Sequence, residues 1–301
     1  MAKARAIVKR RKVVQNIRKI TRTMQLIATA RYQQTFNRAV ASKPYTAKIT
    51  ELVGQLITGI QGRIEHPLLK VNQGTGRCGL LVITSNRGLC GGYNGNVLRT
   101  AVGHLNAREQ AGLSVELHVV GKKGIAYFRF LGREPASTNT RIEDKPKFAD
   151  VEPIAEGFIR QYAAGHVDSV HVAYMRFLSA GTQRPEVLQL LPMPSLPGRS
   201  DPGVAAGPIA RHAMSAADYD FTPAPEAILA ELLPLTVKTR LHQCFMDAAV
   251  SEQVARMVAM KAATEAAGDM IKDLTRKYNR ARQSQITLEL LDIMGGAEAL
   301  A

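Results

Sequence analysis

The sequence predicts an α/β protein joined to a long antiparallel coiled coil. The two ends of the chain would form a rod, and a Rossmann-like α/β domain would lie at its foot. Two observations predict the rod, because apolar residues recur at alternating spacings of three and four near each terminus. A third predicts the domain, because strand-like and helix-like patterns alternate between the ends. The predicted parts are an N-terminal helix at 1–62, the α/β domain at 76–195, a connector at 196–224 and a C-terminal helix at 225–301.

The N-terminal helix is predicted from about residue 5 to 42, because Ala, Arg, Lys, Gln and Met there have high helix propensity. Pro44 is expected to kink or interrupt it, since proline removes a backbone donor and clashes with the preceding turn. An apolar pattern of helical spacing resumes at Ile49 and ends at Gly62. The expected seam of the first helix consists of Val13, Ile17, Ile20, Met24 and Ile27.

The middle of the chain predicts an α/β sheet with largely parallel pairing, because its strands alternate with helical segments. Helices are expected near 96–110 and 151–165, and a helix or turn at 122–132. Hydropathy does not predict the order of the strands in the sheet. The four predicted strands lie at 79–85, 115–121, 168–178 and 185–193.

The C-terminal helix is predicted to begin near Pro225 and to continue to Met294, with Pro234 as a point where it could break. Gly295 and Gly296 are expected to end it. Small residues at 262–268 would let a partner backbone approach closely. The expected seam of this helix consists of Ile271, Leu274, Tyr278, Ala281, Gln285, Leu288 and Leu291.

The net charge of +15 predicts acidic partners, namely nucleic acid, an anionic membrane surface or acidic protein faces. No Asp or Glu precedes Glu51. Because the charges of the first helix flank an apolar seam, a surface that faces an acid is favoured over a merely solvated basic face. These basic residues are Lys3, Arg5, Lys9, Arg10, Arg11, Lys12, Arg18, Lys19, Arg22 and Arg31.

Cysteine content and hydropathy argue against several other classes. Cys78, Cys90 and Cys244 are too few and too scattered to predict a disulfide framework or a zinc site. No apolar run approaches the roughly 20 residues that a membrane span needs. Residues 1–30 have the composition of a mitochondrial targeting helix, but they contain the seam, which a cleaved peptide would have no reason to carry.

No active site, cofactor or metal ligand set is predicted. The glycine-rich turn at 88–95 lacks the Lys and hydroxyl of a phosphate loop, and it also lacks the dinucleotide fingerprint. It is interpreted as a tight turn that packs a helix against a strand. Cys90 is expected to be a small buried residue without a base nearby. His171 lies near His166 in the sequence, but it is interpreted as an ordinary strand residue.

Several segments together resemble the gamma subunit of rotary ATP synthases. They agree with that family in order and spacing over nearly the whole chain. The KIT tripeptide at 19–21 lies where mature bacterial members carry it, which leaves no room for a transit peptide. The matching segments are NIRKITRTMQLIATARY (16–32), SKPY (42–45), SNRGLCGGYNGN (85–96), GKKG (121–124), QLLPM (189–193) and the C-terminal run that begins SEQVARM at 251.

The resemblance implies a non-catalytic rotor shaft, present as a single copy. Its partners would be the alpha and beta subunits of the catalytic hexamer, the epsilon subunit and the membrane c ring, with no nucleic acid and no cofactor. Ion flow through the c ring would turn the shaft, and the shaft would drive conformational cycling of the catalytic beta subunits in ATP synthesis or hydrolysis. Such a complex would be peripheral, on the cytoplasmic face of the bacterial inner membrane.

The family's contact residues can be transferred only where the motifs match. Met24 in TRTMQL resembles the methionine at the beta contact. The polar contacts with beta would be Glu252 and Arg256 in SEQVARM and Arg282 and Gln283 in ARQSQIT. Contacts of the foot with the c ring would be Tyr219 and Asp220 in DYDF.

Two departures from the family and two rival functions accompany the resemblance. Asn86 stands where most relatives have Asp, and Leu288 replaces the usual Gln. The redox-regulated cysteine insertion of chloroplast members is missing, which indicates a bacterial type. A nucleic-acid-binding coiled coil would interleave aromatic residues with its charges, but aromatic residues are sparse here. A small α/β enzyme would need a cofactor loop, which the turn at 88–95 does not resemble.

Overall fold

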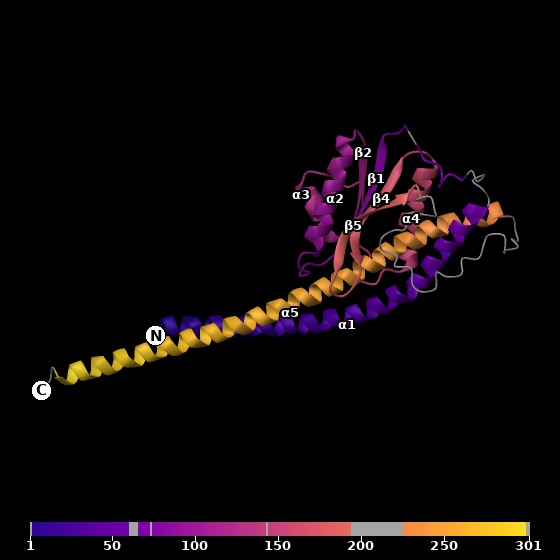
Figure 1. Ribbon diagram of the computed structural model, residues 1–301. Helices are drawn as coiled ribbons and strands as arrows, with labels where there is room; N and C mark the ends of the chain where they lie inside the picture. The colour runs from indigo at the N-terminus through magenta and orange to yellow at the C-terminus, as the bar shows by residue number, and fades with distance from the viewer. Residues whose placement is uncertain (1, 60–65, 73, 143, 194–224, 299–301) are drawn as a thin grey trace. The chain divides into compact units, whose positions relative to one another are not determined.

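The computed structural model describes residues 2–59, 66–72, 74–142, 144–193 and 225–298 (Figure 1). The chain divides into two compact units. One comprises Met1–Ala30 and Arg256–Ala301, the other comprises Arg31–Ala255, and helices α1 and α5 contribute to both. In chain order the elements are α1 (Ala2–Gly59), β1 (Arg77–Ile83), α2 (Tyr93–Gln110), β2 (Ser114–Val120), α3 (Lys122–Phe130), β3 (Ser137–Asn139), α4 (Phe148–Ala163), β4 (Ser169–Phe177), β5 (Gln183–Leu191) and α5 (Pro225–Glu298).

The sheet of the Arg31–Ala255 unit has the strand order β3-β2-β1-β4-β5. Strand β1 pairs in parallel with β2 and β4, and β2 pairs in parallel with β3, which confirms the largely parallel α/β prediction. Strand β5 is antiparallel to β4, because the short connection between Phe177 and Gln183 leaves no room for a crossover. Strand β3 is not among the predicted strands, because it has only three residues, none of them apolar.

Each face of the sheet carries its own apolar core. Successive residues of β1 alternate between the cores, because side chains point to opposite faces along a strand. Leu81 and Ile83 pack with α4 and with the first half of α5. Leu80 and Val82 pack with α2 and α3. Because β1, β2 and β3 are parallel, their carboxyl ends lie at one edge of the sheet.

Both long helices continue through residues that were expected to stop them. Helix α1 runs through Pro44 and α5 runs through Pro234, so neither proline interrupts its helix. Packing on both sides of each proline outweighs its cost of about 3 kcal/mol. Ile49 and Leu233, for example, are at most 7% exposed. Helix α5 also passes Gly295 and Gly296 and ends at Glu298, since an interior glycine costs only about 1 kcal/mol.

In the other unit, α1 and α5 pair antiparallel, as predicted. The guanidinium carbon of Arg11 lies 5.6 Å from the ring centroid of Tyr278. Farther along, the Thr264 hydroxyl lies 2.8 Å from the Thr21 hydroxyl oxygen. Between these contacts, Val14 packs in one apolar cluster with residues of α5. None of the helices described is long and apolar enough to cross a membrane.

The seam that was predicted for α1 is wrong by one residue. Val13, Ile17 and Ile20 are 51%, 46% and 58% exposed, and Ile27 is 49% exposed. The buried positions follow a seven-residue repeat instead, at Val14, Thr21 and Ala28. Large apolar side chains guided the prediction, but this pair of helices places small residues between its backbones. Met24 is half-buried beside the seam.

The seam that was predicted for α5 is mostly correct. Leu274 is buried and Tyr278, Ala281 and Gln285 are half-buried, as is Ile271. Leu288 and Leu291 are 60% and 59% exposed, so their assignment to the seam is wrong. They follow the part of α5 that faces α1, whose described residues begin at Ala2.

The turn before α3 requires glycine for steric reasons. Gly121 has a φ of 98°, and a Cβ there would collide with the backbone carbonyl of Thr84. A Cβ on Gly124 would lie 2.6 Å from the Thr84 hydroxyl oxygen and 2.8 Å from a methyl carbon of Val119. The Thr84 hydroxyl accepts a hydrogen bond from the Gly124 amide at 2.9 Å. The GKKG segment therefore holds the end of β1 against the start of α3.

Replacing Gly121 with Ala should destabilise the protein by about 3 kcal/mol or more, because strain and backbone collision add. Gly132→Ala is the matched control, since Gly132 has a φ of 70° but open space around it. It should cost only about 1 kcal/mol of strain. Chemical denaturation of both variants measures the difference, and equal losses would show that the approach of Thr84 is unimportant.

The corrected seam predicts that substitutions at two β-branched residues of α1 change the stability of the helix pair by different amounts. Val14→Ser should weaken the helix pair by about 2 kcal/mol, because Val14 is 6% exposed. Ile17→Ser should change it by less than about 0.5 kcal/mol, because Ile17 is 46% exposed. Hydrogen exchange of the amides in residues 7–28 reports on the pair. Greater loss of protection in Ile17→Ser would restore the original assignment.

Candidate functional site

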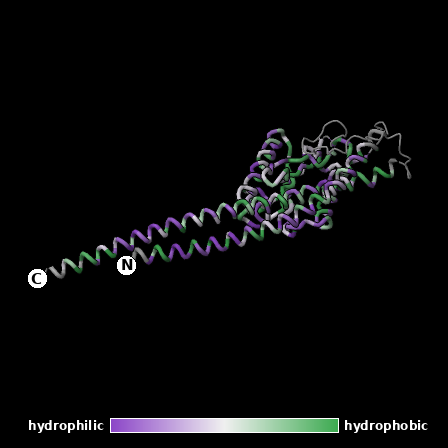
Figure 2. Tube along the Cα trace, turned by 60° about the horizontal axis from the view of Figure 1, so that its bottom comes forward, coloured by the Kyte–Doolittle hydropathy of each residue, from purple (hydrophilic) through white to green (hydrophobic). Residues whose placement is uncertain are grey.

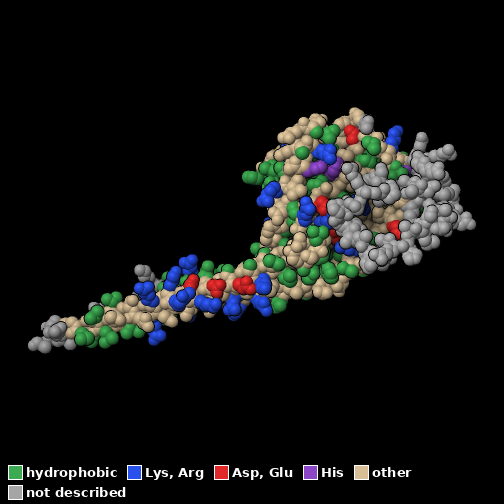
Figure 3. All heavy atoms as spheres, in the orientation of Figure 1, with side chains coloured by type: hydrophobic (Ala, Val, Ile, Leu, Met, Phe, Trp, Pro, Cys, Tyr) green, Lys and Arg blue, Asp and Glu red, His purple; other side chains and the backbone are tan. Residues whose placement is uncertain are grey.

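The outer surface of the helix pair is basic along α1. The side chains of Arg5, Lys9, Arg10, Lys12, Arg18, Lys19 and Arg22 are exposed, and none forms an ion pair with any described residue. Figure 3 shows Lys and Arg side chains along this unit. Two acidic residues of α5 pair on their own helix, Asp269 with Lys272 at 3.0 Å and Asp273 with Arg276. The positive charge of α1 is therefore available to an acidic partner.

An apolar ridge accompanies these charges on α1. We define the outer ridge as the exposed residues Val13, Ile17, Ile20 and Ile27. Helix α5 adds exposed Leu288, Leu290, Leu291, Ile293 and Met294 near its end, where Figure 2 also shows hydrophobic residues. Contiguous exposed apolar side chains bordered by charge are typical of protein–protein contact surfaces.

The residues that the sequence assigned to contacts lie in different environments. Arg282 and Gln283 are exposed on α5, Arg256 is half-buried, and Met24 is half-buried on α1. Glu252 lies in the other unit and is only 8% exposed. Tyr219 and Asp220 lie outside the described residues, as does the predicted connector at 196–224.

A polar cleft of about 260 Å³ lies at the carboxyl ends of the parallel strands in the Arg31–Ala255 unit. Open α/β sheets commonly bind nucleotides at this edge. Here α5 forms a wall of the cleft with Phe245, Ala248 and Glu252. Two acidic side chains, Glu252 and Asp144, and two basic ones, Arg87 and Lys122, line the cleft, so its charges balance and give no net attraction for a polyphosphate.

The glycine-rich turn beside this cleft is held by its own side chains. The Asn94 amide nitrogen donates to the Ser85 hydroxyl at 2.8 Å and contacts the Cys90 sulfur at 3.2 Å. The Ser85 hydroxyl also lies 2.6 Å from the Arg87 carbonyl oxygen. Cys90 is 2% exposed, as expected. These contacts support the interpretation of the segment as a tight turn that packs α2 onto the sheet.

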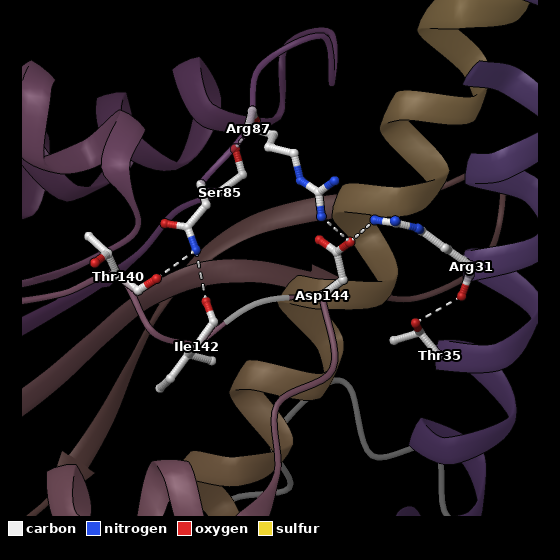
Figure 4. Close-up of polar contacts among 8 residues, drawn as sticks. Arg31, Thr35, Ser85, Arg87, Thr140, Ile142 and Asp144 are labelled. Carbon is white, nitrogen blue, oxygen red and sulfur yellow. Dashed lines mark hydrogen bonds and ion pairs between the residues drawn. The ribbon is translucent and has the colours of Figure 1, made fainter. Parts of the chain in front are cut away.

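A charge cluster fastens helix α1 to the loop after β3. The Asp144 carboxylate accepts hydrogen bonds from Arg31 of α1 and, at 2.7 Å, from Arg87 of the turn after β1 (Figure 4). The Asp144 side chain is 14% exposed, so these ion pairs are partly shielded from solvent. We call Arg31, Asp144 and Arg87 the clasp. It joins three segments that are far apart in the sequence.

Asn86 reinforces the same loop through three hydrogen bonds of its side chain. Its amide nitrogen donates to the backbone carbonyls of Thr140 at 3.1 Å and Ile142 at 3.0 Å. Its side-chain oxygen accepts from the Lys122 amide at 3.1 Å. An Asp carboxylate could accept the last bond but could not donate the other two. The Asn therefore suits a loop that presents two carbonyl groups.

Comparison with known proteins agrees with this architecture. A family model described as ATP synthase matches residues 3–300. The ATP synthase gamma chain of Rhodopirellula baltica is 47% identical over 301 residues, covering 100% of this chain and 99% of the relative. The ATP synthase gamma chain of Leptospira biflexa is 39% identical over 301 residues, and the match covers 100% of both chains.

Solved structures show the same fold at low sequence identity. A chain of the Euglena gracilis mitochondrial ATP synthase, in a structure of OSCP, F1 and c-ring, has a TM-score of 0.64 at 16% identity. The match covers 99% of this chain and 95% of that chain. A chain of the central stalk and c-ring of the Tetrahymena thermophila mitochondrial ATP synthase has a TM-score of 0.59 at 20% identity. That match covers 81% of this chain and 99% of the Tetrahymena chain. Because the family model covers residues 3–300 and two full-length relatives are 47% and 39% identical, the chain belongs to the gamma chain family of ATP synthases.

Proposed function

We propose that this chain is the central rotor shaft of an F-type ATP synthase. It couples the flow of protons or sodium ions through a membrane c ring to the conformational cycling of catalytic beta subunits. The chain is not itself catalytic, because catalysis in such a complex belongs to the beta subunits. The observation that supports this function best is the helix pair, whose outward side combines the apolar outer ridge with cations of α1 that form no ion pair with any described residue.

Coupling requires that each side of the shaft favours one state of a beta subunit over the others. Shifting a site from 1:99 to 99:1 needs roughly 5.5 kcal/mol of preference. An antiparallel pair is asymmetric around its axis, since α1 carries the cations and α5 carries its own ion pairs. A single copy with such unequal sides would present a different surface to each beta subunit.

The proposed coupling contacts are Met24, Arg256, Arg282, Gln283 and Glu252. The exposed Arg282 and Gln283 need no rearrangement to meet a partner, and half-buried Met24 offers an apolar surface that tolerates sliding. For Glu252 the contact is limited to the small exposed part of its side chain. Acidic faces of the alpha and beta subunits would attract the cations of α1 over about 8 to 10 Å at physiological salt.

The α/β unit is proposed to be the foot of the shaft. It would stand on the c ring and contact the epsilon subunit, with Tyr219 and Asp220 on the side of the ring. The complex would then be peripheral on the cytoplasmic face of a bacterial inner membrane. The clasp has a mechanical role in this proposal, because it fastens α1 to the sheet that receives the torque.

The function predicts that Arg282→Ala folds normally but weakens coupling, because Arg282 is exposed. Loss of one charged hydrogen bond costs about 1.5 to 3 kcal/mol, so ATP-driven ion pumping should fall roughly tenfold or more. Lys272→Ala is the matched control, since the Lys272 side chain is 75% exposed and pairs with Asp269 on its own helix. ATP hydrolysis and pumping are measured in the same vesicles after reconstitution. Equal pumping by the two variants would remove Arg282 from the contacts.

The clasp predicts a loss of stability in Asp144→Asn. Two guanidinium groups would then face each other without a carboxylate, at a cost of about 1 to 3 kcal/mol. Asp269→Asn is the control, because its side chain is 74% exposed and its ion pair contributes less than about 0.5 kcal/mol. Hydrogen exchange should increase in residues 140–147 of Asp144→Asn only. Unchanged exchange there would show that the clasp does not fasten the loop.

A further inference from the structure

Three side chains that the sequence scatters meet on the α2 side of the sheet. Cys78 of β1 and His171 of β4 are 0% and 3% exposed, and half-buried His104 projects from α2 above them. The Cys78 sulfur lies 3.3 Å from Nδ1 of His171. The rings of His104 and His171 have centroids 4.6 Å apart. One sulfur and two imidazole nitrogens therefore lie within 4.8 Å of one another.

We propose that Cys78, His104 and His171 form a binding site for a borderline-soft divalent cation such as Zn²⁺. Thiolate and imidazole are the ligands that Zn²⁺ prefers, at about 2.3 Å and 2.0 Å. A tetrahedral ion with these bond lengths separates its sulfur and nitrogen ligands by about 3.5 Å, close to the present Cys78–His171 distance. His104 must approach by a side-chain rotation, and water would complete the coordination.

The protonation states determine how the ion would enter. A guanidinium nitrogen of Arg108 lies 3.1 Å from Nε2 of His171. Because arginine can only donate, Nε2 accepts, and Nδ1 carries the proton that points toward the Cys78 sulfur.

Metal binding would reverse this arrangement. The Cys78 thiol releases its proton to solvent, and the His171 proton transfers from Nδ1 to Nε2, which frees Nδ1 for the ion. One proton is released for each ion bound. Nε2 then donates, so Arg108 loses its acceptor and turns away on the half-buried surface of α2. Arg108 therefore opposes metal binding, through its donor geometry and through its charge.

Arg108 separates the metal site from a purely structural explanation. If the four side chains form only a chain of hydrogen bonds, removing Arg108 breaks a contact and confers no metal affinity. If they form a metal site, Arg108→Gln should strengthen it, because the amide oxygen accepts from Nε2 and the positive charge is gone. Partners of this kind change metal affinity by about 10- to 100-fold.

The test uses the purified full-length chain, stripped with chelator and titrated with ZnCl₂ or CoCl₂. We expect one ion per chain and a near-ultraviolet thiolate-to-cobalt absorption band. Cys78→Ser should abolish the band and weaken Zn²⁺ binding more than about 10-fold. Cys90→Ser is the matched control, since Cys90 is also a buried thiol, 2% exposed, and it should keep both.

His104→Gln provides a second variant at a half-buried position, so the test does not depend on tolerance of changes at Cys78. Circular dichroism verifies the folding of each variant. Loss of affinity in His104→Gln and a gain of about 10-fold in Arg108→Gln support the site. The proposal is overturned if the chain binds no stoichiometric Zn²⁺ or if folded His104→Gln binds it equally well. A cobalt band that survives in Cys78→Ser, or no gain in Arg108→Gln, also overturns it.

Discussion

Burial of the first half of α5 against the sheet is the interaction on which the rest of the structure depends. Leu229, Leu233, Val237, Leu241 and Phe245 recur every four residues and are at most 2% exposed. Burial of five such side chains contributes roughly 10 kcal/mol, which exceeds the cost of about 3 kcal/mol for a proline within the helix. The same helix then continues into the pair with α1. A segment anchored by core packing can thus carry the long helix that coupling needs.

The position of α5 also determines what the α/β unit does. An open sheet of this topology offers a crevice at the carboxyl ends of its parallel strands, where many other α/β proteins bind nucleotides. Here α5 occupies one side of that crevice, and Glu252 and Asp144 line it. The clasp then uses Asp144 to hold α1. In our proposal an edge that serves catalysis in other α/β proteins serves mechanical attachment in this one.

The helix pair separates stability from recognition on the same element. Small side chains such as Ala28 and Thr21 lie between α1 and α5, while Ile17 and Ile20 point outward with the cations. Small side chains meet directly in this seam, since the Thr264 hydroxyl of α5 lies 2.8 Å from the Thr21 hydroxyl oxygen of α1. Large apolar residues are then left for a partner. This division agrees with a shaft whose exterior must contact other subunits.

The sequence alone determined the fold class, the four longer strands and the existence of both long helices, because periodicity reports local burial. It also indicated the gamma family through motifs in the correct order. Only the tertiary structure decided the position of the α1 seam, since hydropathy cannot distinguish a buried small residue from an exposed large one. Likewise, the continuity at Pro44 and the meeting of Cys78 with His104 and His171 depend on packing between segments far apart in the sequence. No local pattern encodes such contacts.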